Sequence, residues 1–70
     1  MKQTLTLEKV DILQILDGLT FRAEVWQRTV AYFNGDYVDG DIAECSDLHE
    51  AETILAHYQE IIKSINQQTT

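Results

Sequence analysis

Two long apolar stripes constrain this 70-residue chain more than any other feature. From Ile12 to Phe33, and again from Leu48 to Ile65, apolar residues recur at alternating intervals of three and four. This spacing places side chains on one face of an α-helix, which a strand cannot do. We therefore expect an all-α domain over residues 1–70, with a first helix over about 7–33 and a second over about 47–66. The predicted seam residues are Ile12, Leu16, Leu19, Trp26, Val30 and Phe33 in the first helix and Leu48, Leu55, Tyr58, Ile62 and Ile65 in the second.

Local signals predict where the first helix starts and stops. Thr6 is a candidate N-cap, because Leu5 before it and Val10 four residues after it stand at the positions of a hydrophobic staple. Asn34 and Gly35 follow the stripe, and both residue types tolerate the left-handed backbone that commonly ends a helix. The predicted helix thus runs from near Leu7 to Phe33.

The second helix has an acidic start signal. Ser46 or Asp47 can cap it, and Asp47 with Glu50 three residues later fits an acidic form of the capping box. The acidic connection between the helices then covers residues 34–46. We expect a short helical turn near Ile42 within it, and Tyr37 and Val38 as its anchors.

Gly18 is the weakest position of the first helix. A mid-helix glycine costs about 1 kcal/mol relative to alanine, unless a neighbouring helix needs the space. Leu16 and Leu19 keep the same apolar register on either side of it, which favours one continuous helix. The alternative is a break at Gly18, which would give a monomeric three-helix bundle.

The chain is near the size at which a single hydrophobic core is marginal. Its one cysteine, Cys45, cannot form a disulfide within the chain. Leu13, Ile15, Val25 and Tyr32 lie outside the main stripe of the first helix, so a two-helix hairpin leaves apolar surface uncovered. We therefore expect an antiparallel helical hairpin that pairs with a second copy into a four-helix bundle.

The net charge of −7 lies in one segment. Residues 36–52 contain seven acidic residues and neither Lys nor Arg, whereas the acidic and basic residues elsewhere balance. Such an asymmetry attracts a basic partner and does not bind nucleic acid directly. The leading hypothesis is a non-enzymatic module that docks a basic protein surface through this segment. The charges least needed to cap the second helix, and so the predicted partner-binding residues, are Asp36, Asp39, Asp41 and Glu44.

Two other functions use the same charges. The first is a small inhibitor of the kind phages use, which blocks a nucleic-acid-binding enzyme by charge mimicry. The second is a fold stabilised by a cation bound to Asp36, Asp39 and Asp41. The segment does not match an EF-hand, because with Gly40 at position 6 of that loop, position 1 is Gly35 rather than an oxygen ligand.

No pattern in the sequence predicts an enzyme or a cofactor site. His49 and His57 are eight residues apart, too far for two imidazoles of one helix to hold a metal together. Glu44 and Asp47 oppose a thiolate at Cys45, and no nucleophile–base pair or glycine-rich phosphate loop is present. The unpaired cysteine and the absence of a signal-peptide or membrane-length apolar run predict a cytoplasmic protein.

Overall fold

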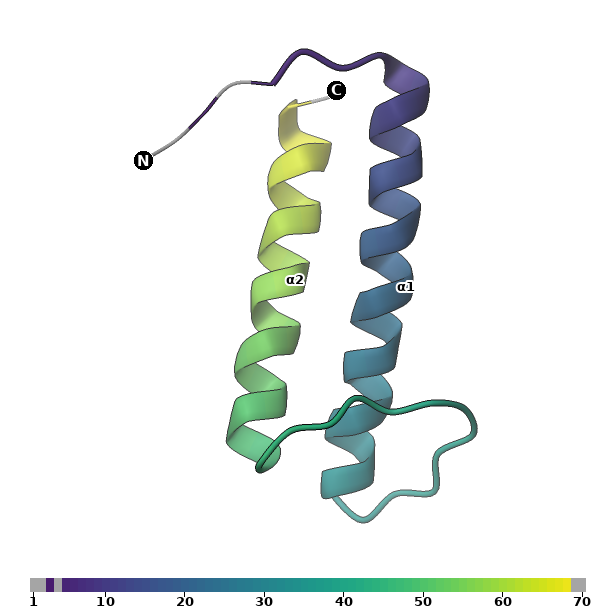
Figure 1. Ribbon diagram of the computed structural model, residues 1–70. Helices are drawn as coiled ribbons and strands as arrows, with labels where there is room; N and C mark the ends of the chain where they lie inside the picture. Colours follow the sequence, from purple (N-terminus) through teal and green to yellow (C-terminus); the bar gives the residue numbers. More distant parts are fainter. Residues whose placement is uncertain (1–2, 4, 69–70) are drawn as a thin grey trace.

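The computed structural model describes residue 3 and residues 5–68, and it consists of two antiparallel helices packed against each other (Figure 1). Helix α1 spans Lys9–Phe33 and helix α2 spans Leu48–Gln68. This confirms the predicted all-α hairpin. We call the end that holds the start of α1 and the end of α2 the open end. The other end holds residues 34–47, called the connection below, and is the loop end.

Helix α1 begins two residues later than Leu7. Its N-cap is Glu8, whose backbone is extended (φ −70°, ψ 153°) and whose side chain makes no capping hydrogen bond. The prediction of Thr6 as N-cap is wrong, because the chain enters helical geometry only after Glu8. Leu5 and Val10 are 77% and 60% exposed, so they form no buried staple.

The end of α1 is a Schellman motif. Gly35 has a left-handed backbone (φ 85°), its N–H donates to the carbonyl of Tyr32, and the N–H of Asp36 donates to the carbonyl of Ala31 at 3.0 Å. The last carbonyls of α1 are thereby satisfied, and the chain turns out of the helix after Phe33.

The start of α2 is capped by Asp47. Its Oδ1 accepts a hydrogen bond from the N–H of Glu50 at 2.9 Å, while Glu50 Oε2 accepts one from the N–H of Ser46 at 3.3 Å. The short helical turn expected near Ile42 is absent from the described connection, whose backbone bonds instead to α1. Helix α2 continues to Gln68, beyond the expected end at residue 66, and residues 69–70 lie outside the described part.

Helix α1 is continuous through Gly18, so the alternative of a break there is wrong. Apart from the two chain neighbours and the surrounding backbone of α1 itself, no atom lies within 4 Å of the position that a Cβ would occupy at Gly18. The hairpin itself therefore has no close contact that would require glycine at this position.

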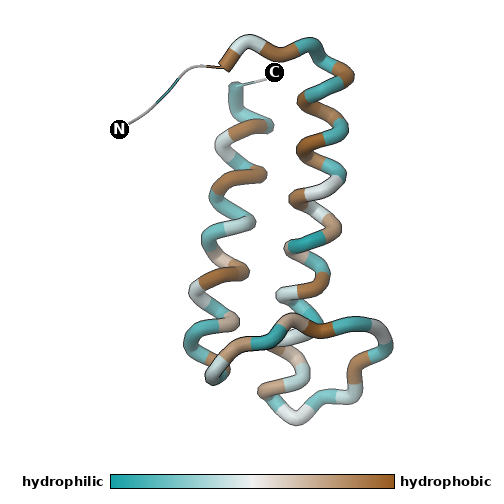
Figure 2. Tube along the Cα trace, viewed as in Figure 1, coloured by the Kyte–Doolittle hydropathy of each residue, from teal (hydrophilic) through white to brown (hydrophobic). Residues whose placement is uncertain are grey.

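Burial is concentrated toward the loop end. The buried apolar residues are Ala23, Val25, Trp26 and Ala51, and Thr29 is fully buried beside them. Phe33 is 36% exposed, because it lies in the last turn of α1, beyond the point where the connection crosses the helix (Figure 1). Figure 2 shows apolar positions continuing along both helices to the open end. The seam residues that are only half-buried are Ile12, Leu16, Leu19, Val30, Leu48, Leu55, Tyr58, Ile62 and Ile65.

Among the described residues, neither helix combines the length and the hydropathy that a membrane span requires.

Candidate functional site

The connection is held against α1 by two adjacent residues of that helix. Arg28 Nε donates to the carbonyl oxygen of Asp41 at 2.8 Å. Thr29 Oγ1 accepts from the N–H of Ala43 at 2.8 Å and donates to the carbonyl oxygen of Val25 at 2.8 Å. The hydroxyl of Thr29 thus links the connection to a buried turn of the helix. These contacts fix the connection at two points separated by one residue.

Gly40 allows this close approach. Its backbone has φ 118°, which L side chains rarely adopt, and a Cβ there would lie 3.1 Å from Arg28 Nε. A side chain at this position would therefore strain the backbone and crowd the guanidinium that holds Asp41 in place.

The four predicted partner-binding residues all lie exposed on the connection. Among the described residues, the carboxylates of Asp36, Asp39, Asp41 and Glu44 have no hydrogen-bond or ion-pair partner. Arg28, the basic residue that contacts the connection, binds a main-chain carbonyl rather than a carboxylate. The structure therefore holds the backbone of the segment in place and leaves these four charges in solvent.

Two further residues of the acidic segment, Asp47 and Glu50, have a different role. The side chains of Asp47 and Glu50 bond to backbone N–H groups at the start of α2, where the helix dipole also favours negative charge. These two residues therefore already have a structural role, unlike the four on the connection.

Residues 36–40 form a bulge. In Figure 1 the connection extends beyond α1 on the side away from α2, then crosses α1 to reach the start of α2. Tyr37 lies in the bulge and is 91% exposed, so the expectation that it anchors the connection is wrong. Val38 beside it is half-buried. Alternate residues of an extended segment face opposite sides, a signal that could have separated the two roles.

A shallow cavity of about 370 Å³ lies between the bulge and α1. The residues that line it include Glu24, Arg28, Tyr37 and Asp39. Sequence reasoning missed this site, because Glu24 and Tyr37 are 13 residues apart and no local pattern connects them.

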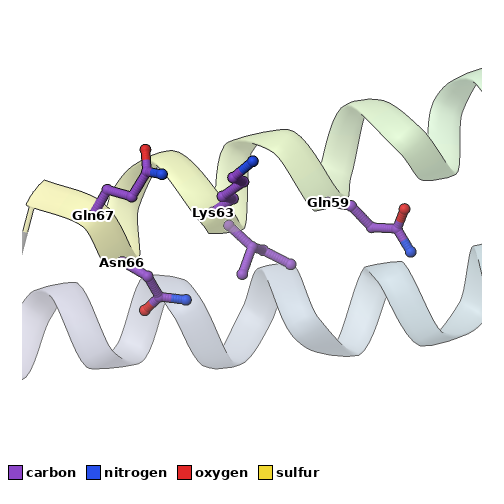
Figure 3. A pocket seen from close by; sticks show the side chains of 5 residues that line it. Gln59, Lys63, Asn66 and Gln67 are labelled. Carbon is purple, nitrogen blue, oxygen red and sulfur yellow. The ribbon is translucent and has the colours of Figure 1, made fainter.

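Two other hollows lie toward the open end. One, of about 530 Å³, is a mainly apolar cleft lined by Leu5, Leu7, Ile12, Ile15 and Ile65 together with polar residues. The other, of about 600 Å³, follows α2 and is lined by Gln59, Ile62, Lys63, Asn66 and Gln67. Figure 3 shows Gln59 and Asn66 on the side of α2 toward α1, with Lys63 and Gln67 on the side away from it. Apart from Lys63, the polar lining of this second groove consists of amides.

Within the part of the chain that the structure describes, no three His, Cys, Asp or Glu side chains are grouped so that they could hold a metal ion. His49 and His57 are exposed on α2, and Cys45 Sγ donates a weak hydrogen bond to the carbonyl oxygen of Asp47 at 3.6 Å. Asp36, Asp39 and Asp41 thus lack the convergent arrangement that a cation site requires.

No protein-family model matches this sequence, and no curated protein or solved structure matches it either.

Proposed function

We propose that this chain is a non-enzymatic interaction protein whose connection docks a basic surface of another protein. The observation that carries the proposal is the cavity of about 370 Å³ between the bulge and α1, with Glu24, Tyr37 and Asp39 in its lining. Asp36, Asp41 and Glu44 extend the acidic surface along the same connection.

Each part of this surface suits a cationic side chain. A guanidinium or ammonium group gains charge-assisted hydrogen bonds from the carboxylates of Glu24 and Asp39. The ring of Tyr37 adds a cation–π contact, worth about 0.5–1 kcal/mol at an exposed site. Arg28 offsets part of the acidic charge, but its Nε is already bonded to the carbonyl of Asp41.

The connection is also ordered before binding. Its bonds to Arg28 and Thr29 hold it on α1, so a partner does not have to supply the free energy of ordering this loop. An acidic surface of this kind mainly increases the association rate with a basic partner, and added salt weakens the effect.

Charge mimicry of nucleic acid would use the same four carboxylates. B-DNA presents one charge per about 1.7 Å of its axis in a regular repeat. The connection is irregular and has no such repeat, so docking of a basic protein surface is the function that the geometry favours.

Binding of a fluorescein-labelled octa-arginine peptide, measured by anisotropy, tests the proposal. Replacing four charges together, as Asp36→Asn, Asp39→Asn, Asp41→Asn and Glu44→Gln, is expected to raise the Kd by at least about 10-fold, since each lost contact of a charged pair is worth on the order of 0.5 kcal/mol. The matched control removes four charges elsewhere, as Glu8→Gln, Asp11→Asn, Asp17→Asn and Glu60→Gln. Equal weakening by both variants would show that net charge alone binds the peptide and would refute a docking site on the connection.

We further propose that the protein acts as a homodimer that forms a four-helix bundle. The hairpin exposes 5690 Å². A compact monomer of its mass would expose about 4,450 Å², so the excess is roughly 1,200 Å². Exposed described residues before α1, such as Leu5 at 77%, contribute to this excess, as do the half-buried seam residues. An excess of this size is within the range that one subunit buries in an obligate homodimer, about 1,000–2,500 Å².

A further inference from the structure

One face of the hairpin carries a cleft at one end. At the other end it carries a ridge, which is the part of the connection that crosses α1. Ile15 and Thr29 are 14 residues apart, close to four helical turns, so they lie on the same face of α1. Ile15 lines the apolar cleft at the open end. Thr29 bonds to the connection at the loop end, where the connection crosses α1 (Figure 1). We call this side of the molecule the cleft face.

Helix α2 extends the cleft face. Ile65 lines the same cleft as Ile15, and Ile61 and Ile54 precede it by four and eleven residues, which places them on the same side of α2. These three isoleucines of α2 are half-buried, and Ile15 is 44% exposed. An apolar row therefore continues from the cleft along the hairpin toward the connection.

The ridge presents one apolar side chain. Ile42 is 38% exposed and stands between Asp41 and Ala43, the two residues whose backbones are bonded to Arg28 and Thr29. The neighbours on both sides are thus held on α1. Ile42 is therefore held at a fixed position on the crossing part of the connection, at the opposite end of the molecule from the cleft.

We infer that a second copy of this chain packs antiparallel on the cleft face, so that Ile42 of each copy lies in the open-end cleft of the other. This inference rests on the proposed homodimer and specifies its arrangement. A two-fold axis makes the contact reciprocal, so one ridge and one cleft per chain are sufficient to form two identical contacts. The pairing covers the apolar row of α2 and both clefts together.

The charge distribution favours this orientation over a parallel one. The loop-end half, residues 23–52, contains eight carboxylates and one basic residue, Arg28, a net charge of −7. The described open-end half has four carboxylates and three basic residues, Lys9, Arg22 and Lys63, a net charge of −1. A parallel pair brings the two −7 halves together. An antiparallel pair places them toward opposite ends of a molecule whose longest extent is 41 Å, so most of their charges lie farther apart than the Debye length of about 8 Å at physiological salt.

The arrangement also leaves uncovered the bulge, which is the part of the docking surface that lines the cavity with α1. The bulge of residues 36–40 extends beyond α1 rather than across the cleft face, so the pairing does not cover Tyr37 or Asp39 (Figure 1). The dimer then presents two acidic docking surfaces at opposite ends, and a partner with two basic patches at a matching separation can bind both.

Distances between spin labels, measured by pulsed electron paramagnetic resonance, test the orientation. The single label is placed at the loop end of the full-length chain by Ser46→Cys in a Cys45→Ser background. The antiparallel pair is expected to give a label-to-label distance comparable with the long dimension of the molecule. A short distance between the labels of a dimer would overturn this inference while leaving the homodimer intact. A monomer in sedimentation would instead refute the homodimer itself.

Charge substitutions test the contact. Ile42→Asp and Ile15→Asp are each expected to raise the dimer dissociation constant by at least about 10-fold, because each places a carboxylate in a desolvated apolar contact. Phe21→Asp is the matched control, since Phe21 is 63% exposed and stands six residues from Ile15, outside the cleft face. Circular dichroism verifies that each variant is helical. Dissociation by Phe21→Asp alone would show that another face of α1 forms the dimer and would overturn the inference.

Discussion

Two glycines of this protein are under opposite constraints. Gly40 has a left-handed backbone (φ 118°), and Arg28 fills the space that a side chain would need. Gly18 lies in the middle of α1 with open space around it. A glycine in the first situation maintains a contact, whereas one in the second only lowers the stability of its helix.

Replacing Gly18 by alanine is therefore expected to stabilise the protein. The free energy of unfolding should rise by about 0.5–1 kcal/mol, the difference between the two residues inside a helix. Urea denaturation followed by circular dichroism measures it. Gly40→Ala is the opposite control and should lower the free energy of unfolding. A loss of stability in Gly18→Ala would mean that another chain approaches α1 at this position.

At the scale of the elements, the connection behaves as a third layer on α1. It bonds to Thr29, which is fully buried beside Val25 and Trp26 in the small core at the loop end. Thr29 is not conspicuous in the sequence, because a threonine outside the apolar stripe resembles any other polar residue of the helix. Its role depends on Ala43, 14 residues away, and only the folded chain brings the two together.

Removing the hydroxyl of Thr29 is expected to release the connection. Thr29→Val keeps the shape of the side chain but leaves the N–H of Ala43 without its acceptor, at a cost of about 1–3 kcal/mol. Hydrogen exchange at Ala43 should accelerate, and octa-arginine should bind more weakly because the connection must now be ordered. Thr20→Val, on an exposed position of α1, is the control. An unchanged exchange rate at Ala43 would show that Thr29 does not hold the connection.

At the scale of the whole molecule, the hairpin is elongated for its size. Its radius of gyration is 14.1 Å, whereas a compact domain of this length has about 11 Å. The buried core residues lie between residues 23 and 51, and the seam toward the open end stays half-buried. In the proposed homodimer, a second copy would supply the burial that one hairpin lacks.

Sedimentation equilibrium over a range of concentrations is expected to give the mass of two chains. The melting temperature should also rise with protein concentration, because dimerisation stabilises the folded state by mass action. The first measurement gives the mass independently of molecular shape, and the second shows whether folding is linked to association. A monomer with a cooperative, concentration-independent melt would contradict the four-helix bundle.

Short-range patterns determined the elements of this protein. The spacing of apolar residues predicted both helices, and Asn34-Gly35 and Asp47 with Glu50 correspond to observed helix-end structures, because these bonds join groups no more than five residues apart. Thr6 failed as a cap, since the staple it needed required burial of Leu5 that the fold does not provide. The distribution of charged residues along the sequence likewise located the acidic segment.

Only the tertiary structure decided how the connection lies on α1, which of its charges stay unpaired and where the cavity and the cleft form. These features depend on contacts such as Arg28 with Asp41 and Thr29 with Ala43, between residues 13 and 14 positions apart. Local spacing carries no information about such contacts, because their free energy depends on the packing of whole elements rather than on neighbouring residues.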